Sequence, residues 1–181
     1  MNKLSKKIIS IVVFLCLSVL LILSFATRKR VSIDKKYYDK EHVALYIFKY
    51  HELPKNYYFK SPIDGRNYDD VDVYGGFIHA YDKRLPEKVS KCNLKECDIY
   101  YEGYNTNTEK GRGNERLVYT TNTNDVKIFY TNDHYISYKE LTKFNLNITS
   151  NVFTILFLTS LSISSISYIL VKKHCINGNT N

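Results

Sequence analysis

A small set of ionisable side chains stands where strands are predicted to begin or end: Glu96, Arg112, Arg116 and His134, with Lys60 nearer the N-terminus. A carboxylate and an imidazole can share general base and general acid work near neutral pH. The three cations suit a substrate that gains negative charge on phosphate oxygens, and arginine is the better donor because it donates in pairs. This set fits the attack of a ribose 2′-hydroxyl on its neighbouring phosphate. Taken singly, each such residue in a β-rich domain is more often an ordinary surface residue.

The elements that must position these side chains are one helix and a run of short strands. Asp39 is a suitable helix N-cap, Val43 and Ile47 fall on one face with Tyr50, and Pro54 prevents the helix from continuing. Strand-like runs, separated by Asn, Asp, Gly and Thr clusters, follow at residues 74–80, 94–101, 116–121, 126–130 and 135–141. The pattern predicts an α+β domain, with an N-terminal helix packed on an antiparallel β-sheet.

The net charge of +8, from 26 basic and 18 acidic residues, belongs to the ends of the chain. Six basic residues lie within residues 1–30 and two within residues 144–181. All 18 acidic residues lie between Asp34 and Glu140, so residues 31–143 are balanced. The excess therefore flanks two apolar segments and indicates a membrane rather than a nucleic acid.

The first apolar segment, residues 8–27, is an uncharged run of 20 residues preceded by three lysines. This order is typical of a secretory signal peptide, residues 1–26, cleaved after Ala26. It fits an uncleaved N-terminal membrane anchor about as well, because about 20 residues span a bilayer. Three interpretations of this segment stay open: a cleaved signal peptide, a retained anchor and a helix that is simply buried in the protein.

The second apolar segment, residues 152–171, predicts a transmembrane helix that ends at Lys172-Lys173 and is followed by a short basic tail, residues 172–181. A buried C-terminal helix of a soluble domain is the alternative. Lys172 and Lys173 favour a cytoplasmic C-terminus, whereas the basic cluster at residues 28–30 argues the other way. We expect a domain of residues 31–143 that is secreted, or membrane-anchored with the domain outside the cell.

The four cysteines predict neither a disulfide framework nor a metal site. Cys97 follows Cys92 by five positions, which span about 16 Å when extended, so these two can pair only if a local turn brings them together. No spacing typical of zinc ligands occurs, and we expect no metal and no other cofactor.

Five segments follow one another in an order that is informative. They are Tyr50-His51-Glu52-Leu53-Pro54-Lys55-Asn56-Tyr57 with Lys60-Ser61; Gly75-Gly76 with Leu85-Pro86; Lys95-Glu96-Cys97-Asp98-Ile99; Arg112-Gly113-Asn114-Glu115-Arg116; and Tyr130-Thr131-Asn132-Asp133-His134-Tyr135. Over about residues 37–141, the chain resembles the small microbial guanyl-specific ribonucleases of the barnase type. The resemblance implies a metal-independent endoribonuclease of single-stranded RNA.

The same resemblance implies a role for each residue. Glu96 would take the proton of the 2′-hydroxyl, and His134 would protonate the leaving 5′-oxygen, leaving a 2′,3′-cyclic phosphate. Lys60, Arg112 and Arg116 would hold the phosphate, while Tyr135 would pack beside the scissile nucleotide. The resemblance implies single-stranded RNA as a partner, and a protein inhibitor as well if the domain is ever in the cytosol. The two apolar segments add the lipid membrane as an expected partner.

The chain departs from the family pattern where the base should be recognised. The loop reads His79-Ala80-Tyr81-Asp82-Lys83-Arg84, one residue shorter than the family's Ser-Asn-Arg-Glu loop. Asp82 is the candidate for its carboxylate, and Lys83 or Arg84 for its cation, so guanine preference stays open. The chain also lacks the family's core tryptophans. The alternative function is a catalytically degenerate membrane protein that uses the fold to bind RNA or protein.

Overall fold

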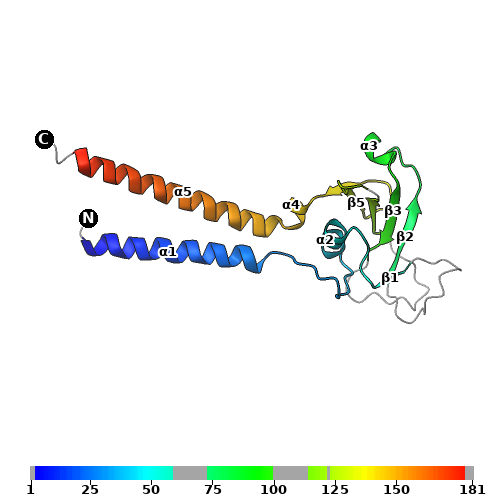
Figure 1. Cartoon of the computed structure of the whole chain (residues 1–181), viewed down its shortest axis with the longest axis horizontal. Coiled ribbons are helices and arrows are strands. Elements are labelled where there is room, and N and C mark those ends of the chain that lie inside the picture. Colours follow the sequence, from blue (N-terminus) through cyan, green and yellow to red (C-terminus); the bar gives the residue numbers. More distant parts are fainter. Residues whose placement is uncertain (1–2, 59–72, 100–113, 122, 178–181) are drawn as a thin grey trace. The chain divides into compact units, whose positions relative to one another are not determined.

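The computed structural model describes residues 3–58, 73–99, 114–121 and 123–177 (Figure 1). The chain divides into two units, Lys29–Leu146 and the pair formed by Met1–Arg28 with Asn147–Asn181. In chain order the elements are α1 (Lys3–Ala26), α2 (Lys40–Tyr50), β1 (Tyr57–Tyr58), β2 (Val73–His79), α3 (Glu87–Ser90), β3 (Leu94–Asp98), β4 (Arg116–Thr120), β5 (Ile128–Thr131), β6 (Lys139–Leu141), α4 (Lys143–Leu146) and α5 (Ile148–Asn177).

Helix α2 begins and ends at residues suited to those positions. The side chain of Asp39 accepts a hydrogen bond from the backbone N–H of His42 at 3.0 Å, as an N-cap should. His51 closes the helix in the left-handed conformation, with φ 61°, and its N–H donates to the carbonyl of Ile47 at 2.9 Å. Pro54 follows, so the helix ends where the sequence predicts.

The strands form one sheet in the order β1-β2-β3-β4-β5-β6. The pairs from β2 to β6 are antiparallel, and the two-residue strand β1 pairs in parallel with the start of β2. Each strand lies beside the one before it in sequence, so short connections suffice. The predicted α+β fold, a helix followed by an antiparallel sheet, is confirmed.

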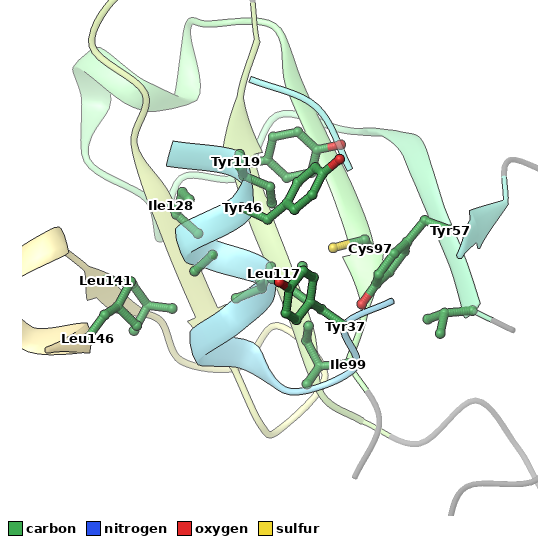
Figure 2. Close-up of a cluster of buried hydrophobic side chains, with 14 residues drawn as sticks. Tyr37, Tyr46, Tyr57, Cys97, Ile99, Leu117, Tyr119, Ile128, Leu141 and Leu146 are labelled. Atoms are coloured by element: carbon green, nitrogen blue, oxygen red, sulfur yellow. The ribbon is translucent and has the colours of Figure 1, made fainter. Parts of the chain in front are cut away.

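The main core lies between α2 and one face of the sheet (Figure 2). Helix α2 contributes Tyr46 and Ile47, which meet Cys97, Leu117 and Ile128 from the central strands. With no tryptophan in the chain, tyrosines supply the aromatic bulk of this core, and Tyr46 is fully buried.

The opposite face of the sheet carries a second, smaller core. Side chains alternate between faces along a strand, so Leu94, Val118 and Phe129 point away from α2 and pack with Leu85 and Val89. Glu96 and Asp98 follow Leu94 at two-residue steps along β3, and Arg116 precedes Val118 by two residues in β4, so their side chains lie on the same face as Leu94 and Val118. The candidate catalytic side chains of Glu96 and Arg116 therefore lie on this second face, opposite the face that packs against α2.

Strands β2 and β3 approach each other closely at Gly75. A Cβ atom added there would lie 2.6 Å from the Cβ of Cys97 and 2.7 Å from the ring of Tyr57. The register shifts between Gly75 and Phe77, which is a β-bulge. A side chain at position 75 would thus push apart the strands that carry the site.

Helices α1 and α5 form the other unit, and both are long and apolar enough to cross a membrane, over Ile8–Ala26 and Ile148–Leu170. Near the end of α1 and the start of α5, three hydroxyl groups meet. Ser24 Oγ lies 2.5 Å from Thr154 Oγ1, and Ser150 Oγ donates to the carbonyl of Ser24 at 2.7 Å. Helix α5 begins at Ile148, before the predicted residue 152, and continues to Asn177, within the segment predicted to be a short tail.

In the described part of the chain one sequence-based expectation needs correction, and one open question is answered. The strand predicted at residues 135–141 is reduced to Lys139–Leu141, because His134 and Tyr135 adopt left-handed backbone angles that no strand allows, φ 54° and 72°. Cys92 and Cys97 do not pair: both are free, with Cys97 buried in β3 and Cys92 exposed before it.

Candidate active site

Glu96 lies in the middle of β3, paired across the sheet with Val118 of β4, and its side chain is 16% exposed. Its carboxylate has two partners: Tyr135 donates its hydroxyl to Oε1 at 3.0 Å, and Nδ1 of His79 lies 2.6 Å from Oε2. Burial acts to raise the pKa of Glu96, but the hydrogen bonds from His79 and Tyr135 and the charge of Arg116 outweigh it and lower the pKa. The carboxylate is therefore ionised near neutral pH, as a general base must be.

Arg116 begins β4 directly opposite Asp98 of β3. Its Nε lies 2.9 Å from Asp98 Oδ1, and the side chains are 4% and 0% exposed. The Nε–H does not point along this contact, so it is an ion pair rather than a hydrogen bond. One terminal nitrogen donates to the backbone carbonyl of Glu115 at 2.7 Å. The guanidinium is thus fixed beside the carboxylate of Glu96.

His134 lies at the edge of this site on a turn held by its neighbours. Asp133 accepts hydrogen bonds from the backbone N–H of Ser137 at 2.9 Å and from its hydroxyl at 2.5 Å, and these bonds lower the pKa of Asp133 to about 2. The backbone N–H of His134 donates to the carbonyl of Asn114 at 3.2 Å. Its imidazole is exposed, with the ring centroid 4.8 Å from that of Tyr135.

Tyr135 connects this turn to Glu96. Its ring lies against His134 and its hydroxyl reaches the carboxylate of Glu96. Burial, followed by the negative charge of Glu96, raises the pKa of Tyr135 to about 12, so the phenol stays protonated and donates. The carboxylate of Glu96 and the imidazole of His134 thus flank one aromatic ring, with the guanidinium of Arg116 beside the carboxylate.

Asp82 and Arg84, two of the residues predicted to recognise the base, are bonded to each other. Asp82 is 8% exposed and accepts from Arg84 through the backbone N–H at 3.0 Å, Nε at 2.8 Å and Nη2 at 2.7 Å. Tyr138 donates its hydroxyl to Oδ2 of the same carboxylate at 2.9 Å, the oxygen that also accepts from Nη2 of Arg84. These bonds, those of Arg84 first, hold the pKa of Asp82 well below its usual range. Lys83 and Arg84 are exposed, while both oxygens of Asp82 are engaged inside the protein.

His79 is the site residue that the sequence reasoning missed. It ends β2, beside the strand that carries Glu96, and its side chain is 9% exposed. One sequence feature could have identified His79: it lies at the end of the strand that precedes the strand of Glu96, and consecutive strands often pair. The bulge after Gly75, however, shifts the alternation, so counting residues along β2 does not place His79 on the Glu96 face.

Two of the predicted catalytic residues, Lys60 and Arg112, lie outside the described residues. Of the others, the structure brings Glu96 and Arg116 together, places His134 at the edge beside Tyr135, and sets Asp82 and Arg84 in a separate ion pair. This arrangement can accept a proton at Glu96, donate one at His134 and stabilise negative charge at Arg116.

Comparison with known proteins agrees with this chemistry. Residues 26–142, more than half of the chain, match the family model described as ribonuclease. None of the curated proteins compared with the chain is significantly similar to it. Because the match covers the helix, the sheet and every candidate site residue, the chain belongs to the ribonuclease family, in its microbial guanyl-specific, barnase-type form.

Proposed function

We propose that this protein is a membrane-tethered endoribonuclease that cleaves single-stranded RNA by transesterification. The observation that carries the proposal is the partly buried, ionised carboxylate of Glu96, with the guanidinium of Arg116 beside it and His134 across the ring of Tyr135. Membership of the ribonuclease family supports the endonuclease activity itself.

In the proposed reaction Glu96 accepts the proton of the ribose 2′-hydroxyl as that oxygen attacks the adjacent phosphorus. The bond from phosphorus to the 5′-oxygen breaks, and His134 donates a proton to this leaving oxygen. The first product is a 2′,3′-cyclic phosphate. Water then opens it with the two roles reversed: His134 takes the proton of water and Glu96 returns one to the 2′-oxygen.

The cations stabilise the phosphate as it gains charge. Arg116 supplies a guanidinium whose position is fixed by Asp98, so that little reorganisation is needed during the reaction. Lys60 and Arg112 are the further cations we propose from the family pattern. We do not assign base recognition to Asp82, because Arg84 and Tyr138 already donate hydrogen bonds to its oxygens.

The direct test is cleavage of single-stranded RNA in EDTA by the purified full chain, with analysis of the product ends. We expect cyclic phosphate ends from the wild type, and a loss of about 10²–10⁴-fold in rate for Glu96→Gln and for His134→Gln. Glu140→Gln and His51→Gln are matched controls, because both are exposed residues outside the site. Absence of cleavage by the folded wild type would favour the binding-protein alternative.

The tether we propose is a helical hairpin in the membrane, with α1 retained. Ser24, Ser150 and Thr154 bond to one another between two helices that are each long and apolar enough to span a membrane, which favours helix association in lipid. Cleavage after Ala26 would remove Ser24 and leave the hydroxyl of Ser150 without this partner. The hairpin puts both chain ends on one side of the membrane and the ribonuclease domain on the other.

We propose that the domain faces outward. Five lysines flank the two spans on the side of the chain ends, against three basic residues at 28–30 on the domain side, so the positive-inside rule favours cytoplasmic chain ends. Cys92 is exposed in the domain and Cys175 lies beyond the second span, so a membrane-impermeant maleimide distinguishes the two sides. We expect labelling of intact cells at Cys92, lost in Cys92→Ser, and labelling at Cys175 only after permeabilisation.

A further inference from the structure

A chain of hydrogen bonds runs from Glu96 to the loop after β2. Nδ1 of His79 lies 2.6 Å from Glu96 Oε2, and its Nε2 lies 3.3 Å from the hydroxyl of Tyr138. Tyr138 donates to Asp82 at 2.9 Å, and Asp82 in turn accepts from Arg84 at 2.8 Å and 2.7 Å. The chain therefore begins at the proposed general base and ends at the loop that in related ribonucleases is expected to bind the nucleobase.

The hydrogens in this chain can be counted. An ionised carboxylate only accepts, so Nδ1 of His79 must carry the hydrogen that it shares with Glu96. For the same reason the single hydroxyl hydrogen of Tyr138 points to Asp82. The contact between Tyr138 and Nε2 is then a hydrogen bond only when Nε2 carries a hydrogen as well. Every contact is satisfied when both ring nitrogens of His79 carry a hydrogen, with Nδ1–H directed at the carboxylate of Glu96 and Nε2–H at the hydroxyl of Tyr138.

The surroundings of His79 fix its orientation. The side chain is 9% exposed, with the ring of Tyr135 at 5.2 Å and that of Tyr138 edge-on at 6.5 Å. Charged or titratable groups on this face come from every neighbouring segment. They are Glu96 and Asp98 from β3, Arg116 from β4, Asp82 and Arg84 from the loop after β2, and His134, Tyr135 and Tyr138 from the turn before β6. An imidazole so enclosed cannot turn away from Glu96 without breaking both of its hydrogen bonds.

We propose that His79 is a positioning residue for Glu96, and that Asp82 acts through Tyr138 to hold His79 in place rather than binding the nucleobase. This inference rests on the proposed function, because it assigns a role relative to the proposed general base. A consequence is that the loop carrying Asp82 and Arg84 controls the state of the catalytic carboxylate over two intervening side chains.

The test compares kcat/KM against pH for the full chain and three variants. His79→Phe removes both ring donors, His79→Asn keeps an N–H donor near the Nδ1 position, and Tyr138→Phe cuts the chain beyond His79. Loss of the donor and of the positive charge raises the pKa of Glu96, so the acid limb of the profile moves to higher pH in His79→Phe. Each unit of that shift lowers kcat/KM on the acid limb about tenfold. We expect partial recovery in His79→Asn and a smaller shift in the same direction in Tyr138→Phe.

Tyr81→Phe is the matched control, because Tyr81 is exposed in the same loop and makes none of these contacts. An acid limb that stays at the wild-type pH in His79→Phe, with the variant folded by near-ultraviolet circular dichroism, overturns the inference. If the wild type itself does not cleave RNA, the proposed function fails instead. Infrared titration of the Glu96 carboxyl, identified by its loss in Glu96→Gln, then decides whether His79→Phe raises its pKa as positioning requires.

Discussion

Replacing Asp98 by asparagine should strongly destabilise the domain. Asp98 and Arg116 are 0% and 4% exposed, and their charged atoms are 2.9 Å apart. Asparagine keeps the shape of the side chain but removes the carboxylate that forms the buried ion pair with the guanidinium of Arg116. Breaking a buried pair in this way costs about 3–5 kcal/mol. That is a large part of the roughly 5–15 kcal/mol that keeps a domain folded, and it should lower Tm by on the order of 10–20 °C.

The measurement is urea unfolding of the full chain in mild detergent, followed by near-ultraviolet circular dichroism. The chain has 17 tyrosines and no tryptophan, and of the tyrosines only Tyr168 lies in a terminal helix, so the signal reports on the domain. Asp34→Asn is the matched control: its contact with Lys55 at 3.1 Å is exposed on both sides and should contribute less than about 1 kcal/mol.

A second comparison separates the buried charge from the lost contact. The double variant Asp98→Leu with Arg116→Met removes both charges and should recover much of the stability, although it should not cleave RNA, since Arg116 is part of the proposed site. A loss of under about 1 kcal/mol in Asp98→Asn, or no recovery in the double variant, would refute the claim that a desolvated guanidinium causes the effect.

The remaining predictions concern the strand contact, the helix cap and acid. Gly75→Ala should destabilise the domain by about 1–3 kcal/mol, measured by the same unfolding assay, because the new Cβ would meet Cys97 at 2.6 Å. Asp39→Ala should cost about 1 kcal/mol by removing the N-cap, and Asp39→Asn should restore most of it. Acid should weaken the fold, because the pKa values of Asp82 and Asp133 are lower in the folded state. Their contribution is complete above about pH 4 and is lost as pH falls through the folded values, about 2 for Asp133, so Tm should fall below pH 4; a constant Tm down to pH 2 would contradict this.

The sequence predicts the helix and most of the sheet because local signals there agree with the fold. Asp39 and Pro54 mark the ends of α2 by their own chemistry, and the strand-like runs are long enough to be recognised. The last strand is the exception. Tyrosine, isoleucine and serine at residues 135–137 favour a strand, but Asp133 binds Ser137 and closes a turn instead. This competition between strand propensity and a side-chain-held turn is not visible in residue types alone.

For the candidate site, the sequence predicts that Glu96 and Arg116 belong together, but it does not predict the hydrogen-bond partners of Glu96 and Asp82. Glu96 and Arg116 follow from their place on neighbouring strands, whose pairing brings them to one face. The engagement of Asp82 by Arg84 depends on how a short loop folds back on itself, and the contact between His79 and Glu96 depends on a bulge. Both are tertiary features that periodicity cannot reveal.

The placement of Glu96 and the stability of the fold depend on the same register. Along β3, Cys97 faces the α2 core while Glu96 faces the site, so a slip of one residue would exchange a buried thiol for a carboxylate. The close approach at Gly75 sets this register, because only glycine allows β2 to lie against Cys97. A substitution at position 75 should therefore reduce activity by more than its loss of stability alone accounts for, since it moves the strand that carries His79 relative to the strand that carries Glu96.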